Sequence, residues 1–105
     1  MNSPAVIPSS FTISITETLA LGVDMTAYLT GWQTVADVTT TLVDQRLGIP
    51  ITMANAPTVA GNIVTQIVNG PTDLASTGSY LMTVNFTAAP STNRWAAELL
   101  LTAVQ

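Results

Sequence analysis

Apolar and polar residues alternate along several stretches of this chain, and this two-residue repeat restricts the fold more strongly than any other feature. The clearest stretch is residues 79–88, whose apolar members are Tyr80, Met82, Val84 and Phe86. Successive side chains of an extended chain point to opposite faces. The pattern therefore predicts a β-strand with one buried face.

Further stretches carry strand signals and are separated by turn signals. The run Thr39-Thr40-Thr41 is rich in β-branched residues, which disfavour a helix and suit a pleated surface. Asn69-Gly70-Pro71 is a strong turn signal, and Pro90 opens another turn. The predicted strands cover residues 9–18, 23–30, 35–46, 49–53, 58–68, 79–88 and 94–104.

Three of these assignments carry specific expectations. In residues 23–30 the alternation places Tyr28 on the polar face of the strand. In residues 58–68, Gly61 is a candidate β-bulge. Residues 94–104 contain good helix formers, so a helix is the alternative there. We favour a strand, because it would pair with the preceding strand as a hairpin.

About seven short strands with a turn every 8–12 residues are typical of an antiparallel, immunoglobulin-like β-sandwich. The sequence therefore predicts an all-β fold with one domain over residues 11–105. The preceding residues 1–10 are predicted to be an extended arm, because Pro4 and Pro8 lack an N–H and disfavour a helix. We expect Pro4, Val6, Ile7 and Pro8 to bind a partner, since an arm that is already extended loses less entropy on docking.

The spacing of Leu74 and Tyr80 refines this fold prediction. Leu74 precedes Tyr80 by six residues, with Gly78 between them, and Tyr80 opens an alternating strand. This spacing resembles the tyrosine corner of immunoglobulin-like domains, where the phenol binds an upstream backbone group. An ordinary core tyrosine at a strand start is the alternative.

The composition excludes most kinds of catalytic mechanism. The chain has no cysteine, no histidine and no lysine, so thiolate and imidazole groups and Schiff-base chemistry are excluded. The acidic residues form no recognisable motif. We interpret Asp24, Asp44 and Asp73 as solvated acids or turn caps, with a calcium site from loop carboxylates as the alternative. The sequence therefore predicts no enzyme, no cofactor and no metal site.

Charge is sparse, and this restricts the partners. Only 8% of the residues are charged, with 2 basic and 6 acidic side chains, against about 25% in ordinary domains. Two arginines cannot form a basic patch, so we expect no nucleic-acid or membrane partner. No apolar run reaches the roughly 18 residues of a membrane span. The first residues lack signal-peptide features, so we expect synthesis in the cytoplasm without export.

An uncharged surface favours assembly with other proteins. Thr, Ser, Asn, Gln and Ala dominate the predicted outward positions, and such groups cost little to desolvate. Lysines, which commonly guard edge strands, do not occur.

The two tryptophans could instead be platforms that stack on sugars. For Trp32, which follows Gly31 near a strand end, a core position is the favoured interpretation. Trp95 opens the last predicted strand on its apolar face. We therefore predict structural roles for both, with a carbohydrate-binding module as the alternative.

Several segments resemble a family of small structural proteins of tailed bacteriophages. The segments that carry the resemblance are residues 29–32, 40–44, 56–66, 78–87 and 95–99. Their motifs are structural rather than catalytic, and they cover most of residues 25–101.

The resemblance implies an immunoglobulin-like domain that is built into a virion. The expected role is a capsid decoration or cement protein that binds other virion proteins, foremost the major capsid protein. A component of the neck, tail or baseplate is the alternative within this class. The expected state is a homo-oligomer, with a trimer favoured because its symmetry suits a capsid axis.

Overall fold

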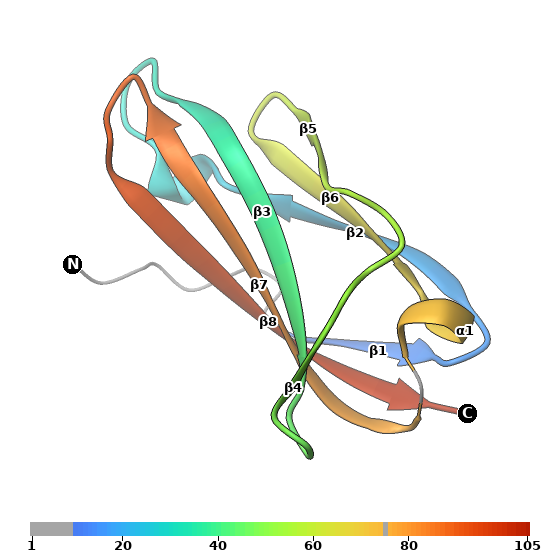
Figure 1. The fold of residues 1–105 in the computed structure, drawn as a ribbon. Coiled ribbons are helices and arrows are strands. Elements are labelled where there is room, and N and C mark those ends of the chain that lie inside the picture. The colour runs from blue at the N-terminus through green and yellow to red at the C-terminus, as the bar shows by residue number, and fades with distance from the viewer. Residues whose placement is uncertain (1–9, 75) are drawn as a thin grey trace.

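The computed structural model describes residues 10–74 and 76–105, which form two β-sheets (Figure 1). Sheet A has the strand order β1 (Ser10–Ser14), β8 (Arg94–Val104), β7 (Gly78–Ala89), β3 (Thr34–Asp44) and β4 (Ile49–Ile51). Sheet B has the order β2 (Thr18–Asp24), β6 (Ile63–Asn69) and β5 (Thr58–Ala60). β1 runs parallel to β8, and the other pairs are antiparallel. The predicted all-β fold is confirmed.

The extended arm falls largely outside this description. Pro4, Val6, Ile7 and Pro8, the predicted docking residues, lie outside the described residues. Ser10 is the first residue of β1. The described ranges hold no helix that is long and apolar enough to cross a membrane.

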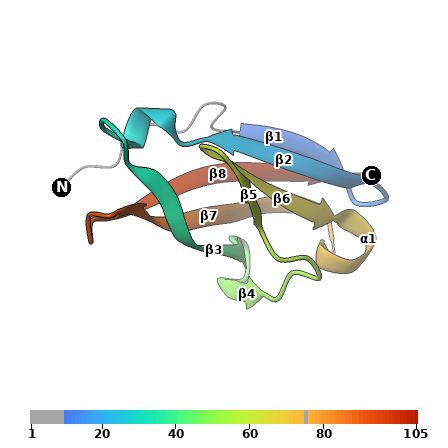
Figure 2. The same cartoon turned by 90° about the horizontal axis from the view of Figure 1, so that it is seen from above.

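The core lies between the two sheets, which Figure 2 shows as two layers seen from above. The alternating side chains of β7 are fully buried, as predicted: Tyr80, Met82, Val84 and Phe86 each expose 1% or less of their surface. Sheet B contributes alternating residues of β2 and β6 to the same core, namely Leu21, Val23, Val64 and Val68. Burying each such side chain stabilises the fold by about 1.5–3 kcal/mol.

Residues 94–104 form a strand and not a helix. β8 pairs antiparallel with β7 along its length, so the predicted hairpin is confirmed. Every second residue of β8 is buried, among them Ala97, Leu99 and Leu101. Because this periodicity of two matches the pleat, packing overrides the helix propensity of the segment.

The strands predicted over residues 9–18 and 23–30 have other bounds: β1 ends at Ser14, and β2 runs from Thr18 to Asp24, so it shares only two residues with the predicted 23–30. The Asp24 carboxylate accepts a hydrogen bond from the backbone N–H of Thr26 at 2.9 Å, and a 3₁₀ turn, η1 (Thr26–Tyr28), follows. The turn breaks the alternation and rotates Tyr28 into the core, where only 4% of it is exposed. The predicted outward position of Tyr28 was therefore wrong.

The prediction for residues 58–68 was wrong in its details as well. Gly61 is not a bulge within one strand but part of the turn between β5 and β6, with φ +59°. This split makes eight strands in the described residues instead of about seven. The bulge lies in β3, where Asp37 has φ +50° and the register with β7 shifts.

At the turn predicted from Asn69-Gly70-Pro71, the chain forms one helical turn, α1 (Gly70–Asp73). The tyrosine corner expected after it has the predicted hydrogen bond. The Tyr80 hydroxyl donates to the backbone oxygen of Ser76 at 2.7 Å, and Leu74 is 2% exposed. The bond ties the segment after α1 to the start of β7.

Candidate interaction surfaces

The outer face of sheet A is broad, polar and almost uncharged. The side chains of β1, β7, β8 and β3 that point away from the core form it, and we call it the threonine face. Its polar members include Thr12, Thr39, Thr41, Thr83, Asn85, Thr87 and Thr102. Arg94 and Glu98 are the only charged residues of β1, β7 and β8, while β3 carries the exposed Asp37 at its bulge. The expected Thr-rich exterior is therefore present.

A short apolar row crosses the threonine face. The strand registers place Val43 opposite Leu81, and Leu81 opposite Leu100. Leu100 exposes 39% of its surface, while Val43 and Leu81 are half-buried. A partner that covered this row would gain about 25 cal/mol per Å² of apolar surface removed from water.

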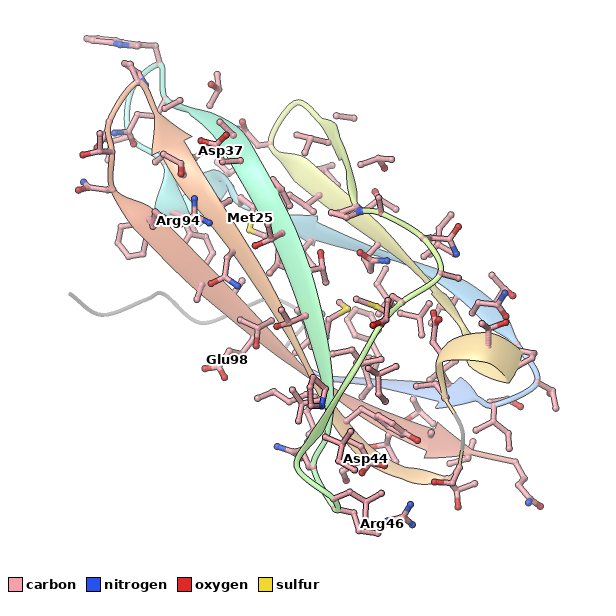
Figure 3. The ribbon with its side chains drawn as sticks, in the orientation of Figure 1. Met25, Asp37, Asp44, Arg46, Arg94 and Glu98 are labelled. Atoms are coloured by element: carbon pink, nitrogen blue, oxygen red, sulfur yellow. The ribbon has the colours of Figure 1, made fainter. Side chains whose placement is uncertain are left out.

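The two charged side chains of β8 have different surroundings. The Arg94 guanidinium donates to Thr87 Oγ1 at 2.7 Å and to the backbone oxygen of Asp37 at 3.4 Å. Arg94 thereby reaches across β7 to the bulge of β3 (Figure 3). Glu98 is exposed and lies opposite Thr83 in the β7–β8 ladder.

Trp32 is exposed, so its predicted core position was wrong. Its exposed fraction is 86%, the largest among the exposed large hydrophobic residues. The core prediction assumed that the strand before Trp32 continues to residue 30, whereas β2 ends at Asp24. Because η1 directs Tyr28 inward instead, Trp32 falls in the turn before β3, beyond the core.

Hydrogen bonds hold the turn that presents Trp32. Gln33 Oε1 accepts from the backbone N–H and the hydroxyl of Thr30, at 3.0 and 3.2 Å, and Gly31 adopts φ +56°. A shallow pocket of about 290 Å³ lies between this turn and Pro90 and its neighbour in the β7–β8 turn. An aromatic ring beside a shallow apolar pocket can bind either a protein partner or a flat sugar face.

Trp95 and the corner residues have structural positions. Trp95 is half-buried and meets the ring of Tyr28 edge-on, with centroids 5.6 Å apart. Tyr80 lies at the start of β7 and Leu74 directly after α1, whereas the pocket beside Trp32 lies at the end of β7. The structure therefore places the corner and the exposed tryptophan at opposite ends of the sandwich.

A second pocket, of about 500 Å³, opens between β3, β4 and the connection from β4 to β5. Gln66 lines it and is 1% exposed; its Nε2 donates to the backbone oxygens of Asn55 and Ile67, both at 2.9 Å. Within the described part of the chain, Gln66 Oε1 and Thr40 Oγ1 have no hydrogen-bond partner. Gln66 was not predicted as a site residue, although its place between Val64 and Val68 on an alternating strand marks it as inward-facing.

Asp24 and Asp44 cap turns, as predicted, whereas Asp73 is buried and not solvated. Asp24 accepts from Thr26, and the side-chain and backbone hydrogen bonds of Thr26 lower the pKa of Asp24. Asp44 accepts from the backbone N–H of Arg46 at 3.0 Å. Asp73 is 1% exposed and binds two backbone N–H groups. No group of three potential metal-ligating acids occurs in residues 10–74 and 76–105.

The surfaces just described offer contacts for a partner. Their main features are the threonine face with its apolar row, the exposed Trp32 and an uncharged pocket beside β3. Comparison of the chain with protein-family models, curated proteins and solved structures finds no match.

Proposed function

We propose that this chain is a structural subunit of a tailed-bacteriophage virion, where it decorates the capsid and cements neighbouring capsid subunits. The observation that carries the proposal is the threonine face, a wide strand surface with only two charges on β1, β7 and β8. Such a face costs less to desolvate than a charged face, provided that its hydroxyl groups find hydrogen-bond partners in the contact. In this proposal the threonine face only binds a partner, and binding requires no reactive side chain.

We infer that the fold is an immunoglobulin-like sandwich. Support comes from the arrangement of a five-stranded and a three-stranded sheet, with a parallel β1–β8 pair at one edge. The hydrogen bond from Tyr80 to Ser76 supports the same inference, since it has the geometry of a tyrosine corner.

Cementing would rest on many modest contacts. A stable protein contact buries on the order of 800 Å² per partner. When each copy touches more than one capsid subunit, the second contact forms at a high effective concentration, and avidity holds the lattice together. In this proposal Pro4, Val6, Ile7 and Pro8 of the N-terminal arm bind a neighbouring subunit, and the copies form homo-oligomers within the virion.

Binding to capsids provides the direct test. Purified particles should contain this chain in a fixed ratio to the major capsid protein, and purified chain should rebind particles that lack it. Thr102→Arg on the threonine face should weaken rebinding, because its cross-strand neighbours Thr12 and Ser79 are uncharged and the new charge would be unpaired in the contact. Thr65→Arg, on the outer face of β6, is the matched control and should bind normally.

The location of the chain on the particle distinguishes the capsid from the alternatives within this class. Copies over the whole shell support the decoration role. Copies confined to the neck, tail or baseplate would transfer the same contact surface to that structure. Absence of the chain from purified particles would refute the virion proposal.

The exposed Trp32 favours carbohydrate binding as a second candidate function. A ring that is 86% exposed beside a shallow pocket suits stacking on a sugar. A glycan array with the purified chain tests this candidate, with Trp32→Ala as the variant. Glycan binding that disappears in Trp32→Ala and persists in Thr102→Arg would support a carbohydrate-binding module instead of a capsid protein.

A further inference from the structure

β8 is covered along only part of its outer edge. β1 pairs with β8 from Leu100 to Val104, as Figure 1 shows for the C-terminal half of the strand. Among the described residues, no strand pairs with the outer edge of residues 94–98. We call residues 94–98 the free edge of β8.

The backbone groups of the free edge are oriented for pairing. The backbone oxygen of Val104 accepts from the N–H of Ile15 at 2.8 Å, so the N–H and C=O groups of Val104 itself face β1. Peptide groups alternate in direction along a strand. The N–H and C=O groups of Arg94, Ala96 and Glu98 therefore point away from β7, toward the free side.

The free edge also has opposite charges at its two ends. It begins with Arg94 and ends with Glu98, and Ala96 lies midway between them. Both charged side chains are exposed, and the Glu98 carboxylate lies beyond the outer margin of β8 (Figure 3). The bonds from Arg94 to Thr87 and Asp37 are at exposed positions, so they can be exchanged for another partner at little cost.

We propose that the free edge of β8 pairs antiparallel with the free edge of a second copy, about a two-fold axis at Ala96. In this register Arg94 of each copy lies directly opposite Glu98 of the other, so two ion pairs form in each dimer. Ala96, a small residue, meets its counterpart at the axis. Sheet A of both copies then becomes one continuous sheet across a self-complementary contact.

The limits of the free edge select this register. The β7–β8 turn precedes Arg94, and Ser10 lies opposite Leu100, so pairing is confined to the residues between them. The midpoint of this segment is Ala96, about which Arg94 and Glu98 exchange places. A parallel arrangement would set Arg94 beside Arg94 and Glu98 beside Glu98, which is unfavourable. The charges therefore specify direction and register as well as affinity.

This contact goes beyond the proposed capsid role and does not depend on it. It makes a dimer the smallest closed unit, which differs from the trimer expected from the sequence. Sedimentation of the purified full chain separates the two, since each chain has a mass of 11.0 kDa.

Charge reversal tests the pairing. Wild-type chain should sediment as a dimer at micromolar concentration. Arg94→Glu and Glu98→Arg should each weaken dimerisation roughly tenfold or more, because each replaces two opposite-charge pairs by two like-charge pairs. The double variant Arg94→Glu/Glu98→Arg should restore the dimer. Arg46→Glu, with the same charge change outside the free edge, is the matched control and should remain dimeric.

A proline at the axis tests the backbone contact separately. The N–H of Ala96 points away from β7, so Ala96→Pro removes no ladder bond within the chain and is tolerated at an edge. It should produce a monomer with an intact thermal transition. Hydrogen exchange should protect the amides of Ala96 and Glu98 only in the dimer.

Three outcomes would overturn the proposal. The first is a wild-type monomer at 100 µM whose free-edge amides exchange rapidly. The second is a monomer in which those amides are protected, since the chain's own N-terminal segment would then cover the edge. The third is a dimer that is unaffected by both charge reversals and by Ala96→Pro.

Discussion

The two ends of the sandwich use the same kind of hydrogen bond in opposite settings. At the α1 end, Asp73 and Tyr80 bind backbone groups from buried positions. This end is also tightly packed, since a Cβ added to Gly70 would lie only 2.5 Å from the backbone oxygen of Glu17. At the Trp32 end, Gln33 and Asp24 cap turns at exposed positions. Losing a hydrogen bond costs most where water cannot replace it. The α1 end should therefore serve stability, and the Trp32 end should be free to serve binding.

The largest effect should come from Asp73. Its two carboxylate oxygens accept from the backbone N–H groups of Ala54 at 3.1 Å and Asn69 at 2.8 Å. Asp73→Ala leaves both donors without their acceptor and should lower the free energy of unfolding by about 4 kcal/mol. Chemical denaturation measures this change. Asp73→Asn, which keeps one acceptor oxygen, should lose about half as much; a loss below about 1 kcal/mol for Asp73→Ala would contradict the comparison.

Tyr80 should show the next effect at the same end. Tyr80→Phe keeps the buried ring and removes only the hydroxyl that donates to the Ser76 oxygen. The expected loss is about 1–2 kcal/mol, which corresponds to a fall in Tm of roughly 5–10 °C for a domain of this size. Differential scanning calorimetry provides the measurement. An unchanged Tm would show that the hydrogen bond from Tyr80 to Ser76 does not stabilise the α1 end.

The sequence predicts the sheets well where the alternation of residues is uninterrupted. In β7 and β8, each apolar position of the repeat is buried or half-buried, since both strands sit in the middle of sheet A with one face on the core. Three short turns interrupt the predicted strands, at residues 15–17, after Asp24 and at Gly61. Asp24 ends β2, and Gly61 follows the end of β5, within runs whose apolar pattern continues. Periodicity alone cannot reveal such a break.

The candidate surfaces also differ in whether the alternation of residues predicts them. The threonine face was predictable because outward positions follow from the same alternation. The exposure of Trp32 was not, because it depends on Tyr28 entering the core after the turn. The free edge of β8 was also out of reach, since it depends on how far β1 extends along its neighbour. Both features depend on contacts between residues that are far apart in the sequence.

At the opposite end of the molecule, removal of Trp32 should hardly change stability. The ring is 86% exposed, so Trp32→Ala exposes little new apolar surface. Its free energy of unfolding should stay within about 0.5 kcal/mol of the wild-type value. The same denaturation experiment compares it with Asp73→Ala. A loss above about 1 kcal/mol would mean that the Trp32 end contributes to stability and that the contrast between the ends is weaker than the burial indicates.

The smallest effect should appear only in acid, at Asp24. Hydrogen bonds from Thr26 lower the pKa of this carboxyl in the folded chain. A carboxyl with a depressed folded pKa contributes stability above its unfolded pKa, near 3.9, and loses that contribution as the pH falls through the folded pKa. The Tm of Asp24→Asn should therefore fall less steeply than that of the wild type between about pH 5 and pH 2. Since the group is fully exposed, the difference should be slight and should diminish in high salt. Parallel Tm profiles would mean that the cap at the Trp32 end sets local geometry without linking stability to pH.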